Sequence, residues 1–390
     1  MRPHLNTKLY AGFRCLPDSY SSVFEAGAQS SFFMTRAWFE NFTEHIVTDT
    51  SKLRIYGVER SDGSPVAALP MIQVLPQRMF APNALESLSN YYTCSFAPAI
   101  RQDQDTEEVV EALTAALWND RRAWEVLNLK PIARDSAIYS RLVKAFRASG
   151  MVVQTYACFG NWYLEVGGRS YDEYLESLSS VLRKNIPYNL RRLEKNGHNE
   201  FVIRTNEEGL EKFLADYEKV YSASWKIREA TPEFIRGMAR IAARNGWLRL
   251  GLIYVDGEPA AAQLWVVHKG TASIYKIAYD ERFAKLSVGT ALTAKLMQRV
   301  IDVDKVRIVD YLSGEDEYKK QWMSHRREFW GILAFNPRTL RGAAQIARHV
   351  GMGACKKAVQ KLAGKGISER LMRWKDRSLR AAQGSVSAGN

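Results

Sequence analysis

Apolar and polar positions follow a similar order in two blocks of the chain. The first block, LRIYGVERSDGSPVAALPMIQV, begins at Leu53, and the second, LRLGLIYVDGEPAAAQLWVV, begins at Leu248. In each block a β-rich run meets an Asp-Gly-x-Pro turn and a second apolar run follows. An Asp-Gly turn between apolar runs is typical of a β-hairpin, because glycine adopts positive φ at little cost. Each block therefore predicts a hairpin.

An aromatic-rich helical segment precedes each predicted hairpin. These segments are TRAWFENFTEHI in the first half and LEKFLADYEKVYSASW in the second. The order of helix and hairpin repeats after roughly 195 residues, which favours one fold used twice over a chance match.

The second half continues with alternating strand and helix patterns. TASIYKIAYD predicts a strand, and the next segment places Val288, Leu292, Leu296 and Val300 on one helical stripe. VRIVDYL predicts a short strand, EYKKQWMSH a helix and REFWGILAFN a last strand. This order indicates a layered α+β domain, and neither GxGxxG nor GxxxxGK[ST] is present.

A basic segment lies between the two halves. Residues 171–197 predict a helix that is interrupted or kinked at Pro187 and ends at Gly197. Two interpretations of its cations are open: a solvated helix face, or a contact with a polyanion such as phosphates or RNA. The cations are Arg183, Lys184, Arg191, Arg192 and Lys195.

Composition narrows the class of protein. The chain has 390 residues, of which 46% are hydrophobic, so it is globular, and its length predicts two domains. Four dispersed cysteines favour reduced thiols and predict neither a disulfide framework nor a zinc site. No apolar run of about 18 residues and no export signal is present, so we expect a cytoplasmic protein.

The net charge of +13 is concentrated near the C-terminus. Residues 338–380 hold twelve Lys and Arg against two acidic residues, mixed with small and apolar ones. Such a basic tail would rest on an anionic membrane surface or contact RNA.

Two short stretches of the second half are candidates for chemistry. KLSVGTAL, beginning at Lys285, joins a strand to a helix start, where unpaired backbone N–H groups can bind phosphate. An ordinary helix start capped by Ser287 is the alternative. DYLSGEDEYKKQW, beginning at Asp310, follows a strand and is either an active-site turn or a connection in which Tyr318 and Trp322 pack together.

Motifs for other chemistries are absent from the sequence. The six histidines show no HExxH or other metal spacing, and no GxSxG elbow is present. We therefore predict no metal site and no serine nucleophile, and direct attack by a substrate amine fits this pattern.

YDERFAKLSVGTALTAKLMQRVI together with VDYLSGEDEYKKQWMSH resembles the GNAT acetyltransferases. The resemblance is strongest to their tandem CelD-like or BioF2-like branch, which is akin to the FemAB peptidyltransferases. It extends over residues 171–335 and fades in the first half, which resembles a degenerate copy. It implies two GNAT-like domains, each a mostly antiparallel sheet flanked by helices, over residues 1–165 and 166–336, with a basic tail over 337–390.

The resemblance also implies roles for particular residues. The GNAT loop that binds the pyrophosphate of acyl-CoA corresponds to Lys285, Leu286, Ser287, Val288, Gly289 and Thr290, although only Gly289 of its glycine pattern is present. Lys319 would help to bind substrate phosphate or stabilise charge at the reacting carbonyl, or Tyr318 would instead act as general acid. Asp310 or Asp316 would orient the acceptor amine or accept its proton. The implied acceptor side consists of Ser224, Trp225, Lys226 and Trp322.

The function implied is N-acylation of an amine, such as an amino sugar or amino acid intermediate of envelope or exopolysaccharide assembly, with acetyl-CoA or another acyl-CoA as donor. A lipid-linked acceptor would suit a protein whose tail contacts a membrane. Two alternatives stay open: an aminoacyl-tRNA-dependent peptidyltransferase of the FemAB type, and a non-catalytic scaffold.

Overall fold

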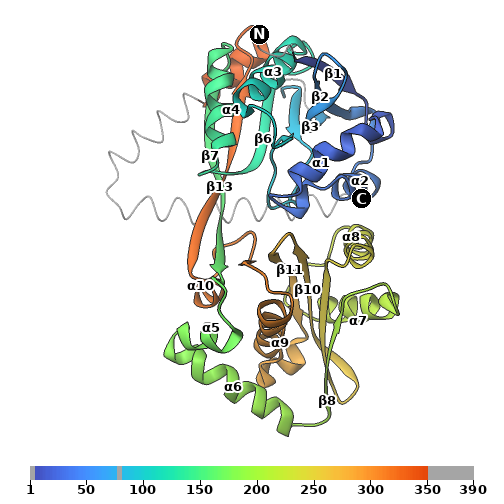
Figure 1. Ribbon diagram of the computed structural model, residues 1–390, viewed down its shortest axis with the longest axis vertical. Helices are drawn as coiled ribbons and strands as arrows, with labels where there is room; N and C mark the ends of the chain where they lie inside the picture. The colour runs from blue at the N-terminus through green and yellow to red at the C-terminus, as the bar shows by residue number, and fades with distance from the viewer. Residues whose placement is uncertain (1–4, 77–80, 350–390) are drawn as a thin grey trace.

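A computed structural model describes residues 5–76 and 81–349. Two halves of the chain form it, and Figure 1 shows them one above the other. The first half contains β1 (Asn6–Tyr10), α1 (Ser21–Gly27), α2 (Arg36–His45), β2 (Leu53–Glu59), β3 (Pro65–Val74), β4 (Ala84–Ser87), β5 (Ala99–Ile100), α3 (Thr106–Asn119), β6 (Val126–Ala133), α4 (Ala137–Ala148) and β7 (Val152–Glu165).

The second half begins with two helices and then repeats the same order. It contains α5 (Tyr171–Ser177), α6 (Ser180–Lys195), β8 (Asn199–Arg204), α7 (Leu210–Ser222), α8 (Pro232–Arg244), β9 (Leu248–Val255), β10 (Glu258–His268), β11 (Thr271–Tyr279), α9 (Val288–Gln298), β12 (Ile308–Asp310), α10 (Glu317–Trp322) and β13 (His325–Phe335).

The repeated order is visible in the strand pairing. Both predicted hairpins are confirmed, because β2 pairs with β3 and β9 with β10 in antiparallel fashion. Each half also has a parallel pair, β4 with β6 and β11 with β12. The predicted α+β class is therefore confirmed, with two halves of similar element order in tandem.

The last strands of the two halves are exchanged. All the described strands belong to one sheet, in which β6, β13, β7 and β12 are consecutive neighbours. β13 of the second half therefore lies beside β6 of the first, and β7 of the first half lies beside β12 of the second. Both strands run between the halves in Figure 1. The domain boundary at 165/166 stays a prediction, but the sheet is continuous across it.

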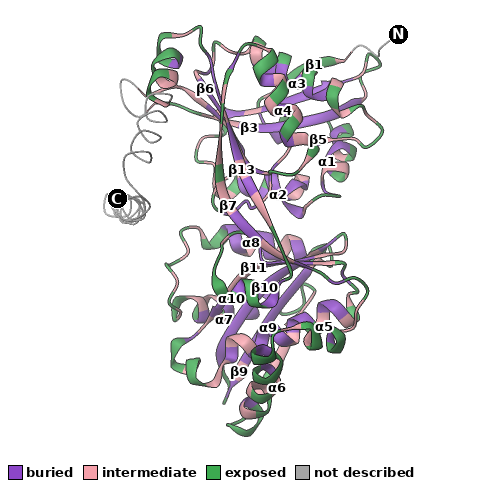
Figure 2. Ribbon diagram, turned by 90° about the vertical axis from the view of Figure 1, so that its left-hand side faces the viewer, coloured by how far each residue is buried: buried purple, intermediate pink, exposed green. Residues whose placement is uncertain are grey.

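Helices cover both faces of the second-half sheet. Buried side chains of α7 and α8 join the core of the first half, and Asn41 of α2 donates a hydrogen bond of 3.1 Å to the carbonyl of Phe234 in α8. α6 and α9 cover the other face, where they build a separate core with α5. In Figure 2 the buried residues follow the sheet, whereas α6 is largely exposed. The two halves therefore share one packed interface.

The basic segment differs from its prediction in where it is interrupted. The break falls between Ser177 and Ser180, where Ser179 accepts a hydrogen bond from the backbone N–H of Leu182 and begins α6. Pro187 lies inside a continuous α6. A serine cap satisfies N–H groups that a new helix start leaves unpaired, and this capping decides the boundary. The prediction of an interruption at Pro187 was wrong.

The C-terminal segment is described only in part. Residues 340–349 are helical. The remainder of the predicted basic tail, residues 350–390, lies outside the described residues.

Candidate active site

A cavity opens where β11 and β12 part. The two strands pair in parallel over only three positions, ending at Ser273 opposite Asp310. Beyond that point β11 continues to Tyr279, while the segment that follows β12 turns at Leu312 toward α10. The space between them is a cavity of about 190 Å³, which we call the wedge cavity.

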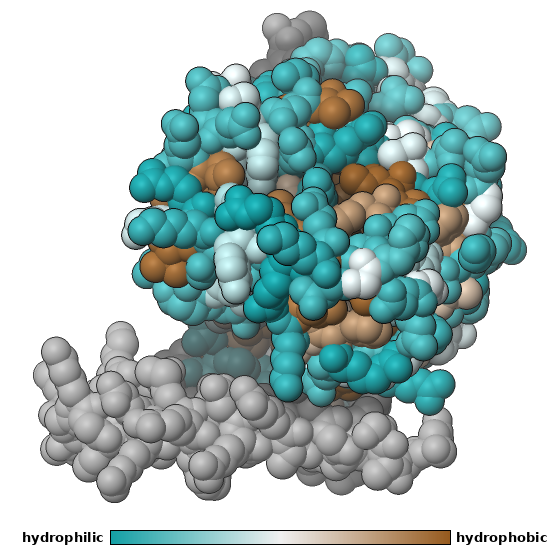
Figure 3. Space-filling view, turned by 90° about the horizontal axis from the view of Figure 1, so that it is seen from below, coloured by the Kyte–Doolittle hydropathy of each residue, from teal (hydrophilic) through white to brown (hydrophobic). Residues whose placement is uncertain are grey.

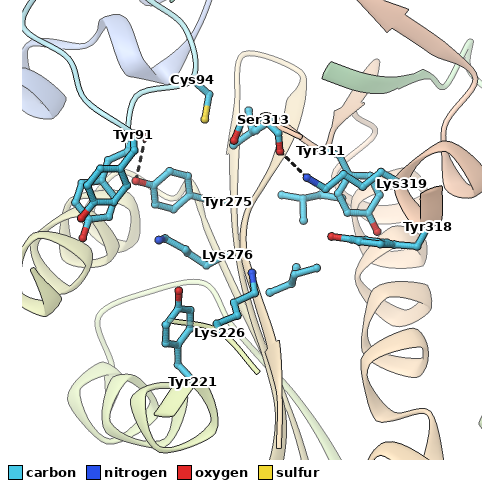
Figure 4. Close-up of a pocket in the computed structure, with 14 residues that line it drawn as sticks. Tyr91, Cys94, Tyr221, Lys226, Tyr275, Lys276, Tyr311, Ser313, Tyr318 and Lys319 are labelled. Atoms are coloured by element: carbon cyan, nitrogen blue, oxygen red, sulfur yellow. Dashed lines mark hydrogen bonds between the residues drawn. The ribbon is translucent and has the colours of Figure 1, made fainter. Parts of the chain in front are cut away.

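Residues from both halves line the wedge cavity, and Figure 4 shows how they converge. Six are tyrosines and three are lysines, so the cavity is aromatic and cationic. The lining consists of Tyr91, Tyr92, Cys94, Tyr221, Lys226, Ile274, Tyr275, Lys276, Ile277, Tyr311, Leu312, Ser313, Tyr318 and Lys319.

Lys319 is held firmly at the wall of this cavity. It is 8% exposed, its ammonium donates a hydrogen bond to the carbonyl of Ser313, and it lies 3.2 Å from a carboxylate oxygen of Asp316. Gly314 makes this contact possible, since a Cβ there would stand 2.7 Å from the Lys319 nitrogen. An ammonium has three donors, so these two partners leave one N–H available for a bound group.

A buried network fixes the turn that presents Ser313 to Lys319. Leu312 has φ of 56°, an unfavourable value for a branched residue. One Asp310 oxygen accepts a hydrogen bond of 2.7 Å from the N–H of Leu312, and Asn161 donates one of 2.7 Å to the Leu312 carbonyl. Arg327 binds both Asp310 and Asn161. Asp310 therefore faces this network and is absent from the wedge-cavity lining.

Lys226 and Lys276 stand on the opposite side of the cavity from Lys319 (Figure 4). Lys276 pairs with Glu229 at 2.7 Å, and Glu229 also accepts a hydrogen bond from Tyr92. Lys226 has no carboxylate partner among the described residues. Burial, reinforced by the charges of Lys276 and Lys319, lowers the pKa of Lys226 to about 8. A neutral amine is therefore accessible near physiological pH.

Tyr318 lines the cavity beside Lys319 and is 40% exposed. Its ring meets that of Tyr311 edge to face at 5.8 Å, and burial raises the pKa of its hydroxyl, which therefore stays protonated. Trp322 does not reach the cavity: it is 5% exposed within the core beneath α5 and α6. Tyr318 and Trp322 thus face different surroundings, although both belong to α10.

The remaining predicted acceptor residues lie on the turn after α7. Ser224 accepts a hydrogen bond of 3.3 Å from the N–H of Lys226, which helps to orient that residue. Trp225 is 51% exposed, and its ring lies 4.6 Å from the ring of Tyr279. Of this group, only Lys226 lines the wedge cavity.

The predicted phosphate loop lies at the far end of β11 and does not line the wedge cavity. Residues 281–286 form a short 3-10 helix, Ser287 has φ of 57°, and α9 begins at Val288. Ser287 makes no side-chain cap, which leaves its predicted capping role unfilled. A Cβ on Gly289 would stand 3.0 Å from the ring of Tyr279. The ring therefore covers one side of this glycine.

Sequence reasoning missed residues that the fold brings to the site. A lysine inside the apolar run TASIYKIAYD was a usable signal for Lys276. Tyr91, Tyr92 and Cys94 come from a first-half loop, and no local pattern connects that loop to β11. Arg327 lacks such a signal too, because only the pairing of β13 with β7 brings it to Asp310.

Comparisons with known proteins agree with this geometry. Residues 180–320 match the family described as Acetyltransferase (GNAT) domain. The second half therefore contains a GNAT domain. The GNAT domain includes β11, α9, β12 and most of α10, and so carries most of the wedge-cavity lining.

Solved structures extend the similarity across both halves. The crystal structure of FemX superposes with a TM-score of 0.57 and 12% identity, covering 82% of this chain and 96% of FemX. That likeness shows the fold. Also similar are L-PGS from Bacillus licheniformis (TM-score 0.48, 15% identity, 79% and 94% covered) and a tandem GNAT protein from the clavulanic acid biosynthesis pathway (TM-score 0.48, 13% identity, 86% and 100% covered). No curated protein matches the sequence.

The described part of the chain lacks two further features, a metal-binding cluster and a membrane-spanning helix. It holds no group of three or more His, Cys, Asp or Glu side chains arranged for a metal ion. Among the same residues, no helix combines the length and apolar character needed to cross a bilayer.

Proposed function

We propose that this protein transfers an acyl group to an acceptor amine inside the wedge cavity. The divergence of β11 from β12 beside Lys319 carries the proposal, because it opens a slot with one available ammonium donor at its wall. A fixed cation in a partly desolvated cavity stabilises the oxyanion of acyl transfer more strongly than water does.

The lining residues supply the steps of such a transfer. The amine nitrogen attacks the acyl carbonyl carbon, and Lys319 stabilises the negative charge that develops on the carbonyl oxygen. Lys226, in its neutral form, accepts the proton that the amine loses. The bond from the acyl carbon to its carrier then breaks, and the hydroxyl of Tyr318 protonates the leaving atom. Lys226 then releases its proton to solvent and Tyr318 takes one up from solvent, which restores both residues.

Direct attack by the amine is favoured over a covalent enzyme intermediate. Among the described residues, Cys94 is the one cysteine at the cavity, and burial raises the pKa of its thiol to about 11. A thiol that stays protonated at neutral pH is a poor nucleophile. The substrate amine is therefore the nucleophile in this proposal.

For the donor, we favour an aminoacyl-tRNA over an acyl-CoA. Support comes from the predicted phosphate loop before α9. It contains a single glycine, Gly289, and the ring of Tyr279 covers one side of that glycine. Further support comes from α6, which packs against the 3-10 helix before α9 and presents exposed cations suited to a phosphodiester chain. The FemX-like fold and the FemAB resemblance agree with this donor.

A product assay tests the proposal. The full chain is incubated with tRNA charged with labelled amino acids and, separately, with labelled acetyl-CoA, each with glucosamine, lysine and ethanolamine as acceptors. We expect a labelled amide from charged tRNA, identified by mass spectrometry. Transfer from acetyl-CoA alone would contradict the tRNA donor, and an absence of amide from both donors would contradict the function.

A further inference from the structure

A second cavity, of about 240 Å³, adjoins the wedge cavity. Both cavities are lined by Cys94 and Leu312, which stand at their common border. We call the second one the hydroxyl cavity. Its lining consists of Gln29, Ser30, Ser31, Phe32, Phe33, Cys94, Ser95, Ala133, Asn161, His268, Thr271, Ser273, Ile308, Asp310, Leu312, Arg327 and Phe329.

Hydroxyl groups in this lining are free to bind a ligand. Thr271 and Ser273 lie two positions apart on β11, so their side chains point to the same face of the sheet. With Ser95, they have hydroxyls that make no hydrogen bond to any described residue. Ser273 is only 5% exposed. These hydroxyls line the cavity and make no hydrogen bond within the described part of the chain, so they are available to a polar occupant.

The charges around the hydroxyl cavity compensate one another. Asp310 and Arg327 form an ion pair, although one terminal nitrogen of Arg327 keeps N–H groups without a partner among the described residues. His268 is 7% exposed, and burial lowers its pKa to about 4, so it is neutral at physiological pH. The cavity therefore favours a polar but uncharged occupant.

Aromatic rings complete the lining. Phe32, Phe33 and Phe329 provide apolar surface beside the hydroxyl-bearing residues. A ring compound with hydroxyl groups at its edge and C–H groups on its faces matches both kinds of surface. The volume also suits such a ring. The cavity holds about 240 Å³, whereas one water molecule in the liquid takes up only about 30 Å³.

We propose that the hydroxyl cavity binds an uncharged sugar ring of the acceptor and places the attached amine in the wedge cavity past Cys94 and Leu312. This inference rests on the proposed function, because it names the acceptor class of the same reaction. It assigns Ser95, Thr271 and Ser273 to acceptor specificity.

Binding of glucosamine to the full chain tests this inference without turnover. Calorimetry would compare glucosamine with cyclohexylamine, which has a similar ring and amine but no hydroxyl groups. We expect glucosamine to bind in the millimolar range and cyclohexylamine at least about 10-fold more weakly. Thr271→Val keeps the side-chain shape and removes a hydroxyl, and should weaken glucosamine binding about 5-fold.

Thr155→Val provides the matched control, because it makes the same change on β7 outside both cavities and should leave glucosamine binding unchanged. Ser273→Ala is a second cavity variant and should act like Thr271→Val. Equal binding of the two amines, or glucosamine binding that neither cavity variant alters, would overturn the inference.

Failure of the inference is distinguishable from failure of the proposed function. Hydroxyl-dependent glucosamine binding without any amide product supports the sugar site and contradicts acyl transfer. An amide formed only with lysine or ethanolamine, together with no glucosamine binding, supports acyl transfer and overturns the sugar site.

Discussion

Three ammonium groups meet in the wedge cavity, and their different partners give them different chemistry. Lys276 is paired with Glu229, and Lys319 is held by Ser313 and Asp316, whereas Lys226 has no carboxylate partner among the described residues. Burial and the neighbouring charges of Lys276 and Lys319 favour loss of a proton from Lys226, because no carboxylate stabilises its ammonium form. Lys226 is therefore the group suited to accept a proton, and the other two keep the site cationic.

The pH dependence of transfer should report on Lys226. Its neutral form, which accepts the proton, predominates above its pKa of about 8, so the rate should rise with pH and level off above that value. Lys226→Met should lower the rate and remove this limb of the profile. Both proteins are measured with one acceptor, so that titration of the acceptor amine cancels. Identical profile shapes would exclude Lys226 as the base.

Arg327 should support both stability and activity. Arg327→Met leaves Asp310 buried without its cation, which we expect to cost about 3 kcal/mol of unfolding free energy and to release the turn at Leu312. Urea unfolding measures the first effect, and the transfer rate of the folded protein measures the second.

The buried pair of Arg249 and Asp304 offers the matched control for that experiment. Two hydrogen bonds of 2.8 Å join them away from both cavities. Arg249→Met should destabilise the fold by a similar amount yet leave the transfer rate of the folded protein unchanged. If both variants lose activity equally, the network around Asp310 has no specific positioning role.

At the level of helices and strands, α6 presents an outward basic face. Val181, Lys184, Tyr188, Arg191 and Lys195 recur at helical spacing and are exposed. Figure 3 views the molecule from below, where its surface is mostly hydrophilic. An exposed tyrosine among cations can stack on a base while the cations contact phosphates.

Neutralising α6 should weaken tRNA binding. Lys184→Gln with Arg191→Gln, both on this face, should reduce affinity and lower the salt dependence of binding by about one to two phosphate contacts. The equivalent double change on α4, Arg141→Gln with Arg147→Gln, is the control and should have little effect. Filter binding over a range of salt concentrations measures both. Equal losses in the two variants would count against α6 as the tRNA surface.

Much of this element order could be predicted from sequence, and the reasons for the failures are physical. Asp-Gly turns predicted both hairpins, because the turn and its flanking strands are adjacent in the sequence. The break before α6 was misplaced, since Pro187 is a stronger local signal than the Ser179 cap. The hydroxyl cavity could not be foreseen: Thr271, Ser95 and Phe329 lie on segments that only tertiary pairing brings together.

Over the whole molecule, strand exchange makes the halves interdependent. β7 pairs with β12 and β13, and β13 pairs with β6. Fragments 1–165 and 166–336, cut at the predicted boundary, should each lack a neighbouring strand and unfold without cooperativity. Co-expressed, they should associate and recover a cooperative transition by circular dichroism. Full cooperative folding of each fragment alone would show that the exchange is dispensable.

The central claim is that Lys319 stabilises an acyl-transfer oxyanion in the wedge cavity. The most direct test is the single-turnover rate of amide formation from the donor and amine that react with the wild-type chain, measured for Lys319→Met and for Lys320→Met. Lys320 follows it on α10 but is exposed, so its variant is the matched control. We predict a loss of about 100-fold or more for Lys319→Met, unchanged unfolding curves, and a near wild-type rate for Lys320→Met. A folded Lys319→Met protein with the wild-type rate would contradict the account.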